Sequence, residues 1–173
     1  IEEVGRHVWS EYAPVADVSI AETPEHLTVA EAERLDYRPA EDMHRWGEPW
    51  GTAWFRLRCE VPESFAGEPV ALKFKPDGEC IIFRDGEPVQ GLDNNRDDYL
   101  LLPKASGGEA IELYVEAGAN SAFGGFWKRE MRRPHLAVLN REVWNCYYAL
   151  RYLEELLPTE TGRGIFGERL PFT

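Results

Sequence analysis

Cysteine is scarce in this sequence, and its three cysteines are not arranged for disulfides or zinc. They lie far apart, at Cys59, Cys80 and Cys146, in an odd number and without a Cys-x-x-Cys pair. A disulfide framework needs paired cysteines, and a structural zinc site needs closely spaced ones. We therefore expect buried, reduced thiols, which are typical of cytoplasmic proteins, and we predict a cytoplasmic location.

Long apolar runs and catalytic signatures are also lacking. No apolar segment approaches the roughly 20 residues that a membrane-spanning helix requires, so no membrane partner is predicted. The four histidines do not occur in His-x-His, His-x-Asp or His-Glu-x-x-His, the spacings that bring zinc ligands together. Acidic residues are so abundant that no pair stands out as catalytic carboxylates. The sequence thus predicts no catalytic residue, no metal ligand and no cofactor in this chain.

Positive charge is outweighed by negative charge. The chain has 31 acidic and 19 basic residues among 173, a formal net charge of -12 at pH 7. Such a surface repels nucleic acid and anionic membranes at long range. Nucleic acid is therefore not an expected partner, whereas neutral or cationic ligands fit. Hydrophobic residues make up 43% of the chain, enough for a globular core without disulfides.

Alternating apolar and polar residues between positions 53 and 117 predict a series of short strands. Phe55, Leu57 and Cys59 alternate with charged residues, as in a strand with one buried and one wet face. Further strands are predicted at 70–74, 80–83, around 89, 99–102 and 111–117. The connections are too short for crossover helices, which excludes parallel βαβ units. The predicted fold class is mainly β, an antiparallel β-sandwich or jelly roll.

Two turn sequences flank the predicted strand at 80–83. In Pro76-Asp77-Gly78, proline presets φ, aspartate bonds locally, and glycine can adopt a positive φ. Asp85-Gly86 predicts a two-residue hairpin, because both central positions of a type I′ turn need a positive φ.

The first 50 residues are harder to assign. Residues 15–20 have the composition of a strand. Thr23-Pro24-Glu25 is typical of a helix start, with threonine as N-cap and proline at the first helical position. Partial alternation from Leu27 onward also fits a strand, so the type of this segment stays open.

The spacing of apolar residues changes to every third or fourth position between 134 and 158. It predicts one long helix with an apolar stripe, and Trp144 and Tyr148 lie on a second face. A helix with two apolar faces needs two neighbours, so missing sequence or another subunit is expected to cover one of them. The predicted organisation is a β-sandwich at 1–133 with an irregular N-terminal segment, a linker helix at 134–158 and a flexible linker at 159–173.

Trp46, Trp50 and Trp54 recur every four residues before and within the first clear strand. Aromatic faces can stack on the C–H surfaces of sugars, so these residues are candidates for a carbohydrate-binding platform. The alternative is packing in the core or at the sandwich edge, because aromatic side chains dominate buried area.

Several segments resemble the N-terminal β-domain of glycoside hydrolase family 38 α-mannosidases of the cytosolic type. They are WGTAWFR at 50–56, VPESFAG at 61–67, the DGE at 77–79 and RDGEPVQGLD at 84–93, the last being the most specific. The segment LAVLNREVWNCYYALRYLEELL at 136–157 is similar to the linker helix that leads toward the catalytic barrel of that family. One departure is Cys80, where the family pattern has glycine.

The resemblance implies a galactose-binding-domain-like jelly roll that belongs to a retaining, zinc-dependent α-mannosidase. It places the zinc ligands and the nucleophilic aspartate in a downstream barrel, in a His-x-Asp context that this chain lacks. No catalytic or metal residue is therefore transferred to this sequence. The implied partners are the downstream barrel of the same polypeptide, possible further copies in a homo-oligomer, and possible carbohydrate.

Three functions remain open on the sequence. The first is a non-catalytic accessory domain of an α-mannosidase, supporting the barrel or an oligomer interface and inactive alone. The second is a stand-alone carbohydrate-binding module, which predicts tryptophans in an open groove. The third is a structural or interaction β-sandwich, which predicts an exposed apolar patch without sugar affinity.

Overall fold

The computed structural model describes residues 1–120 and 128–156, which divide into two compact units. Glu11–Val138 form the larger unit, a β-sandwich, and Ile1–Ser10 together with the segment from Leu139 onward form the smaller one. The predicted linker at 159–173 lies outside the described residues.

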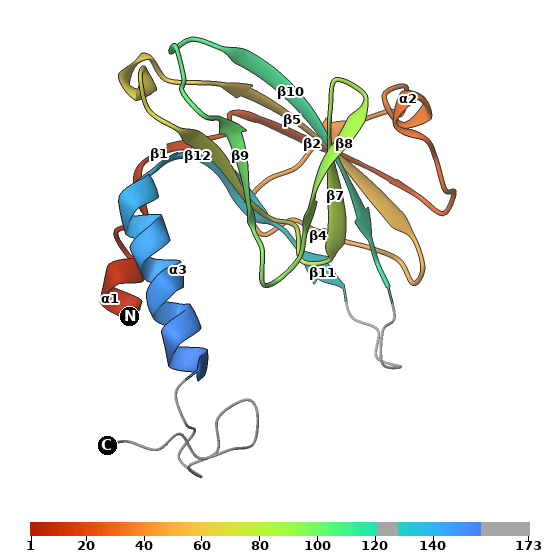
Figure 1. Ribbon diagram of the computed structural model, residues 1–173. Helices are drawn as coiled ribbons and strands as arrows, with labels where there is room; N and C mark the ends of the chain where they lie inside the picture. The colour runs from red at the N-terminus through yellow and green to blue at the C-terminus, as the bar shows by residue number, and fades with distance from the viewer. Residues whose placement is uncertain (121–127, 157–173) are drawn as a thin grey trace, which may run out of the picture. The chain divides into compact units, whose positions relative to one another are not determined.

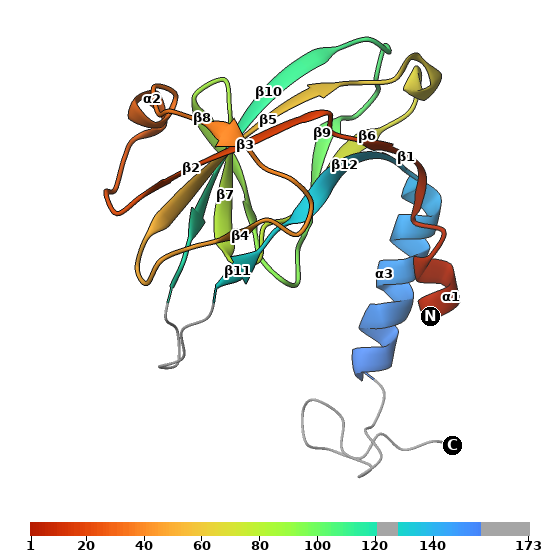
Figure 2. The same ribbon diagram turned by 180° about the vertical axis from the view of Figure 1, so that it is seen from behind.

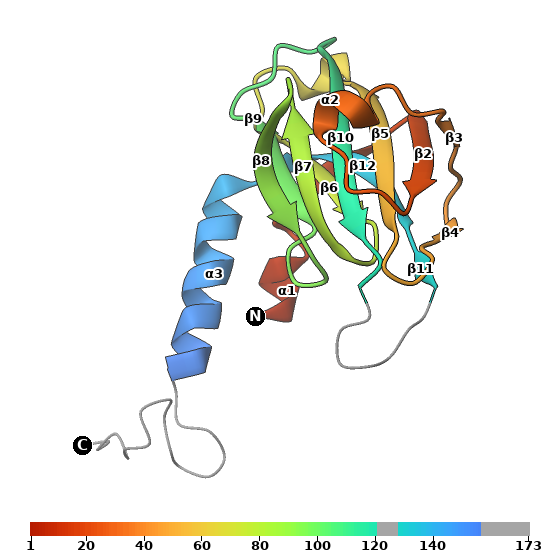
Figure 3. The same cartoon turned by 90° about the vertical axis from the view of Figure 1, so that its right-hand side faces the viewer.

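The larger sheet of the sandwich has the strand order β3-β2-β5-β10-β7-β8 (Figures 1 and 3). Its strands are β2 (Asp17–Thr23), β3 (Arg38–Pro39), β5 (Thr52–Glu60), β7 (Glu79–Arg84), β8 (Glu87–Leu92) and β10 (Ala110–Gly118). Each neighbouring pair is antiparallel. Among them, β7 and β8 are joined by a two-residue turn, as the sequence predicts.

The smaller sheet has the order β1-β12-β6-β9 and lies behind the larger one in the view of Figure 3. Its strands are β1 (Trp9–Pro14), β6 (Val70–Lys75), β9 (Asp98–Leu102) and β12 (Arg132–Leu139). A short ribbon of β4 (Arg45–Trp46) and β11 (Arg129–Glu130) adjoins them (Figure 2). A 3₁₀ turn, η1 (Glu63–Phe65), precedes β6.

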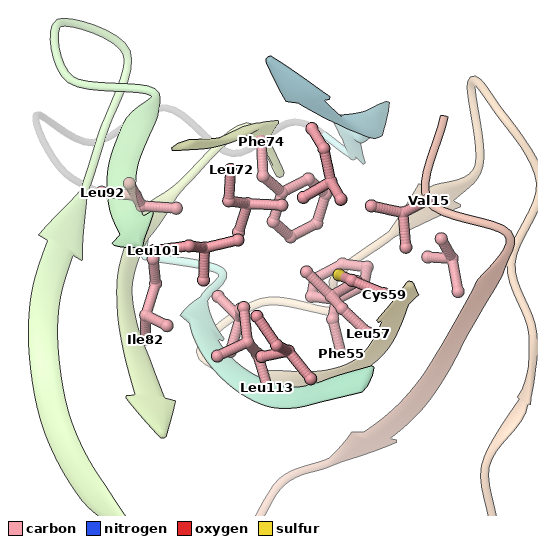
Figure 4. Packing of buried hydrophobic residues seen from close by; sticks show 14 of the residues in the cluster. Val15, Phe55, Leu57, Cys59, Leu72, Phe74, Ile82, Leu92, Leu101 and Leu113 are labelled. Carbon is pink, nitrogen blue, oxygen red and sulfur yellow. The ribbon is translucent and has the colours of Figure 1, made fainter. Parts of the chain in front are cut away.

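One hydrophobic core fills the space between the sheets (Figure 4). Phe55 and Leu57 of β5 point into it from one side, and Leu72 and Phe74 of β6 from the other. The Phe55 ring meets the rings of Trp46 and Phe74 edge-on, at centroid distances of 5.6 and 5.4 Å. The alternating residues of β5 thus face the core as predicted, and the prediction of a mainly β, antiparallel sandwich or jelly roll is confirmed.

The turn predictions are confirmed in one case and corrected in the other. Asp85 and Gly86 both have positive φ, 53° and 80°, and join β7 to β8. In the other turn the residue with positive φ (67°) is Asp77, and Gly78 is needed for space instead. A Cβ at Gly78 would lie 3.0 Å from the carbonyl oxygen of Gly118.

The helix that begins after β2 starts later than the Thr23-Pro24 pattern indicates. Residues 17–23 are β2, and the one-turn helix α2 spans Val29–Ala32. Its cap is Thr28, whose backbone N–H donates to the Glu31 carboxylate at 2.8 Å. This reciprocal cap satisfies a free N–H at the helix start, and the Thr23 hydroxyl accepts only a local bond from the Glu25 N–H. α2 lies on the outer side of the larger sheet (Figure 3).

The prediction of one helix from residue 134 to 158 is wrong in its first part. Residues up to Leu139 form β12, and helix α3 spans Arg141–Leu156. The run Leu136–Leu139 is buried throughout, so it lacks the alternation that marks a half-exposed strand. The strand's apolar residues therefore continue the helical spacing by coincidence. Asn140 separates the two elements, and its side-chain oxygen accepts a 3.2 Å hydrogen bond from the Val143 N–H.

The smaller unit consists of α1 (Glu2–Gly5) and α3. Gly5 allows close packing, because a Cβ there would lie 2.8 Å from the Tyr147 ring. Tyr148 contacts Trp144 and Tyr147 along the helix, at ring distances of 4.6 and 5.2 Å. No described residue of α3 is fully buried.

Candidate functional site: a pocket on the outer face of the larger sheet

The three tryptophans singled out by their spacing do not form a shared platform. Trp46 and Trp54 are 0% exposed, whereas Trp50 is 70% exposed. Trp46 belongs to the core between the sheets. Trp54 precedes Phe55 on β5 and therefore points to the opposite face of the sheet. Stacking on a sugar is accordingly excluded for Trp46 and Trp54 in this arrangement and stays a prediction for Trp50.

A second layer of side chains explains why Trp54 is buried on the outer face. Its ring lies 5.6 Å from that of Phe83. Beside them, the Arg56 guanidinium lies 4.6 Å from the centre of the Tyr37 ring, a cation–π distance. The Tyr37 hydroxyl donates to the Ala32 carbonyl oxygen of α2 at 3.1 Å. The segment around α2 thus covers part of the outer face.

The outer face is left open at the end of strands β5, β10 and β7, where a pocket of about 430 Å³ is found. We call it the outer-sheet pocket. It is lined by His26, Trp50, Gly51, Thr52, Glu79, Cys80, Ile81, Glu116, Gly118 and Asn120. In the register of the sheet, Gly118 lies between Thr52 and Glu79, and Glu116 lies beside Ile81. The glycine at 118 leaves room for the Asn120 side chain, whose oxygen would lie 2.7 Å from a Cβ at that position.

The polar groups of the pocket include both acceptors and donors. The Asn120 amide donates to a Glu79 carboxylate oxygen at 2.7 Å. Partial burial raises the pKa of Glu116, and the nearby His26 opposes that rise. The pocket therefore presents two carboxylates, an amide, an imidazole and the Thr52 hydroxyl beside an exposed indole.

Trp50 is held at the pocket in an unusual backbone conformation. Its φ is +63°. A positive φ is uncommon for any residue other than glycine, and especially for a bulky one. Its N–H donates to the Ala119 carbonyl at 3.1 Å, and the Ala119 N–H donates to the Gly51 carbonyl at 2.9 Å. These bonds tie the loop to the end of β10 and fix the point from which the indole projects.

The described residues hold no group of three or more His, Cys, Asp or Glu side chains that could bind a metal ion. None of the helices described is long and apolar enough to cross a membrane.

Sequence reasoning singled out Trp50 but not His26, Glu79, Glu116 or Asn120. Glu116 belongs to an alternating strand and reads as a solvated residue. Glu79 and Asn120 are 41 positions apart, and only the register of β10 against β7 brings them together. The pairing partner of a strand is not encoded in its own pattern, so no local signal marks this pocket.

Similar folds occur in solved glycosidases of low sequence identity. The β-glucuronidase of Ruminococcus gnavus in complex with uronic deoxynojirimycin matches with a TM-score of 0.53 at 11% identity, over 74% of this chain and 29% of that one. The same enzyme with D-glucaro-d-lactam gives a TM-score of 0.52 at 10% identity. At this identity the likeness concerns the fold alone.

Sequence relatives are closer. Alpha-mannosidase 2C1 of Homo sapiens is 34% identical over 171 residues, which covers 90% of this chain and 16% of the relative. Its counterpart in Mus musculus is 38% identical over 162 residues, 85% of this chain and 15% of the relative. The chain thus spans about one sixth of the length of these relatives.

The match to a family model is consistent with both comparisons. The model described as "Alpha-mannosidase, jelly roll domain" covers residues 13–151, which include both sheets from Ala13 onward and most of α3. The resemblance noted in the sequence is thereby confirmed, and this chain belongs to the family of α-mannosidase jelly roll domains.

Proposed function

We propose that this chain is the N-terminal, non-catalytic domain of a larger α-mannosidase of glycoside hydrolase family 38, and that it supports the catalytic part of the same polypeptide. The observation that carries the proposal is the coverage: 90% of this chain aligns with 16% of an α-mannosidase at 34% identity. Most of the length of that enzyme lies outside the aligned part, and we assign the catalytic machinery to it.

The residues that carry the resemblance support a structural role. Asp85-Gly86 forms the β7–β8 hairpin, and Phe55 and Phe65 are buried in the core. These residues specify turns and packing rather than chemistry. We assign the zinc or other divalent metal expected for the parent enzyme to the remaining sequence.

The surface of α3 supports a further contact with that remaining sequence. Tyr148, Tyr152 and Leu153 are among the most exposed large hydrophobic side chains of the described residues. Clustered exposed apolar groups mark interaction surfaces, and α3 is the last described element before the chain continues. We assign this face to the downstream part of the polypeptide, with a second copy as the alternative.

A cytoplasmic location fits the same proposal. Cys59, Cys80 and Cys146 are all free thiols, and two of them are buried. Free cysteines persist in reducing compartments.

The proposal is tested by hydrolysis of an aryl α-mannoside in the presence of zinc or cobalt. We expect turnover by the longer polypeptide and none by residues 1–173. Turnover by this chain alone would overturn the assignment as non-catalytic.

The supporting role has its own test in the longer polypeptide. Phe55→Ala leaves a cavity in the sandwich core and should shorten the half-life of activity at elevated temperature. Tyr12→Ala removes a mostly exposed ring and serves as the control. Equal half-lives for both variants would contradict support of the catalytic part by this domain.

A further inference from the structure

We propose that the outer-sheet pocket binds a neutral saccharide, with one sugar ring stacked on Trp50 and its hydroxyl groups bonded to Glu79, Glu116 and Asn120. The inference stands on residues of this chain and does not depend on where the catalytic part lies. It replaces the platform of three tryptophans with a site built from one tryptophan and three separate strands.

The exposure of Trp50 is the first reason. An indole that is 70% exposed leaves most of its apolar face in water, which is unfavourable by roughly 25 cal/mol per Å². Its backbone is also held at a positive φ by the bonds between the loop and Ala119. A flat apolar face beside hydrogen-bonding groups suits a sugar ring, which presents C–H groups on one face and hydroxyls at its edge.

The shape of the floor is the second reason. Gly118 lies at the centre of the pocket between Thr52 and Glu79. A Cβ at this position would approach the Asn120 side-chain oxygen to 2.7 Å, so the amide occupies the space that a side chain would take. With a volume of about 430 Å³, the pocket falls in the size range of small-molecule sites.

The mixture of donors and acceptors distinguishes a saccharide from an ion. Each sugar hydroxyl both donates and accepts hydrogen bonds. The carboxylates of Glu79 and Glu116 accept, whereas the Asn120 amide and the Thr52 hydroxyl can also donate. An anion would meet two carboxylates and a chain with a net charge of -12. A cation would find acceptors and an aromatic face, but it would leave the donor groups unused.

Two of the hydrogen-bonding residues, Glu116 and Asn120, are also partly shielded from water, which strengthens directional bonds. Glu116 has intermediate exposure on the floor of the pocket, and no hydrogen bond occupies it in the described contacts. Glu79 is oriented by its bond to Asn120. Such preorganised acceptors lose little freedom when a hydroxyl binds.

The test is a titration of residues 1–173 with methyl α-mannoside, methyl α-glucoside, methyl β-galactoside and mannotriose, followed by two-dimensional amide NMR and calorimetry. We expect at least one glycoside to shift the signals of the Trp50 indole, Gly118 and Asn120, with a dissociation constant of about 1–10 mM for an open pocket. Absence of these shifts with all four probes would overturn the proposal.

Variants separate stacking from folding. Trp50→Ala should weaken binding about tenfold, a value in line with the loss of an aromatic contact, and Trp50→Phe should retain most of it. Trp50→Gly relieves the positive φ, so it should fold at least as well as the parent and still fail to bind. Tyr12→Ala, which removes an exposed ring outside the pocket, should leave the affinity unchanged. Equal affinities for Trp50→Ala and Tyr12→Ala would contradict stacking.

Carboxylate recognition is tested in the same way with Glu116→Gln, and Glu60→Gln on an exposed end of β5 is the matched control. We expect a several-fold loss only for Glu116→Gln. N-acetyl-arginine amide serves as the cationic probe. Binding of this probe without binding of any glycoside would overturn the saccharide and identify the pocket as a site for a basic side chain.

Discussion

The indole N–H of Trp46 donates a 2.8 Å hydrogen bond to the carbonyl oxygen of Pro76, 30 residues further along the chain. The ring is fully buried, and it fixes the turn between β6 and β7 to the ribbon that contains β4. The Trp46 side chain therefore links β4 to the β6–β7 turn, two segments that are distant in the sequence.

This hydrogen bond predicts that Trp46→Phe lowers the free energy of unfolding. The Pro76 carbonyl would remain buried without its donor, at a cost of about 1–3 kcal/mol, and the smaller ring would leave a cavity besides. Urea unfolding followed by circular dichroism should show a lower midpoint with an unchanged slope. Trp50→Phe, at the exposed tryptophan, should change stability by less than about 0.5 kcal/mol. Similar losses in the two variants would refute the role of the buried bond.

The same turn makes a second prediction at Gly78. A Cβ there would lie 3.0 Å from the Gly118 carbonyl oxygen and 3.3 Å from the Trp46 ring, and neither a sheet backbone nor a buried ring can move easily. Gly78→Ala should therefore cost about 1–3 kcal/mol, as overpacking does.

The control for Gly78 is Gly91→Ala in the neighbouring hairpin. Within 4 Å, a Cβ at Gly91 would meet only the Cys80 carbonyl oxygen, at an ordinary 3.6 Å. Alanine also has less backbone freedom than glycine in the unfolded chain, which favours folding of the variant slightly. Thermal unfolding of both variants distinguishes close packing from a general intolerance of alanine. A destabilisation as large in Gly91→Ala would contradict the prediction.

Strands with alternating polar and apolar residues could be predicted from the sequence, whereas a strand buried on both faces could not. The strands between 53 and 117 are readable because polar residues alternate with apolar ones, as the exposed Arg58 and Glu60 show beside the buried Leu57 and Cys59 on β5. β12 has no wet face over Leu136–Leu139, so its period is hidden and its residues merge with those of α3. Asn140 was the available signal for the boundary, since asparagine is a preferred N-cap.

The outer-sheet pocket could also be predicted only in part from the sequence. Trp50 was predicted as a candidate because its side chain type carries a specific chemistry, but two of its companions turned out to be buried. The pocket partners Glu79 and Glu116 depend on which strands lie next to each other. That arrangement arises from nonlocal pairing, which the alternation within one strand does not report.

Glu116 predicts a pH-dependent effect on stability. Burial raises its pKa above the ordinary value of 4.5, despite the opposing influence of His26. The folded state therefore binds the Glu116 proton more tightly than the unfolded state does. This difference in proton affinity stabilises the fold in acid, and the stabilisation is lost as pH rises through the folded-state pKa. Glu116→Gln removes the desolvated charge and should be more stable than the parent at pH 7.

The measurement is the unfolding midpoint of both proteins between pH 4 and pH 7. The advantage of Glu116→Gln should shrink as the pH falls toward the acidic end, where the parent carboxyl is also neutral. Glu60→Gln controls for the loss of one negative charge from the whole chain. An advantage that grows toward low pH would contradict the sign of the shift.

The cysteines predict selective labelling of the native chain. Burial raises the pKa of the Cys59 thiol to about 12, and burial together with the carboxylates of Asp77 and Glu79 also raises that of Cys80. Thiolates are the reactive form, so neither should react with iodoacetamide at neutral pH, whereas Cys146 is exposed. Mass spectrometry should find one adduct in the native protein and three in denaturant. Cys146→Ser should remove the native adduct, and rapid labelling of Cys80 would contradict its burial in the core between the sheets.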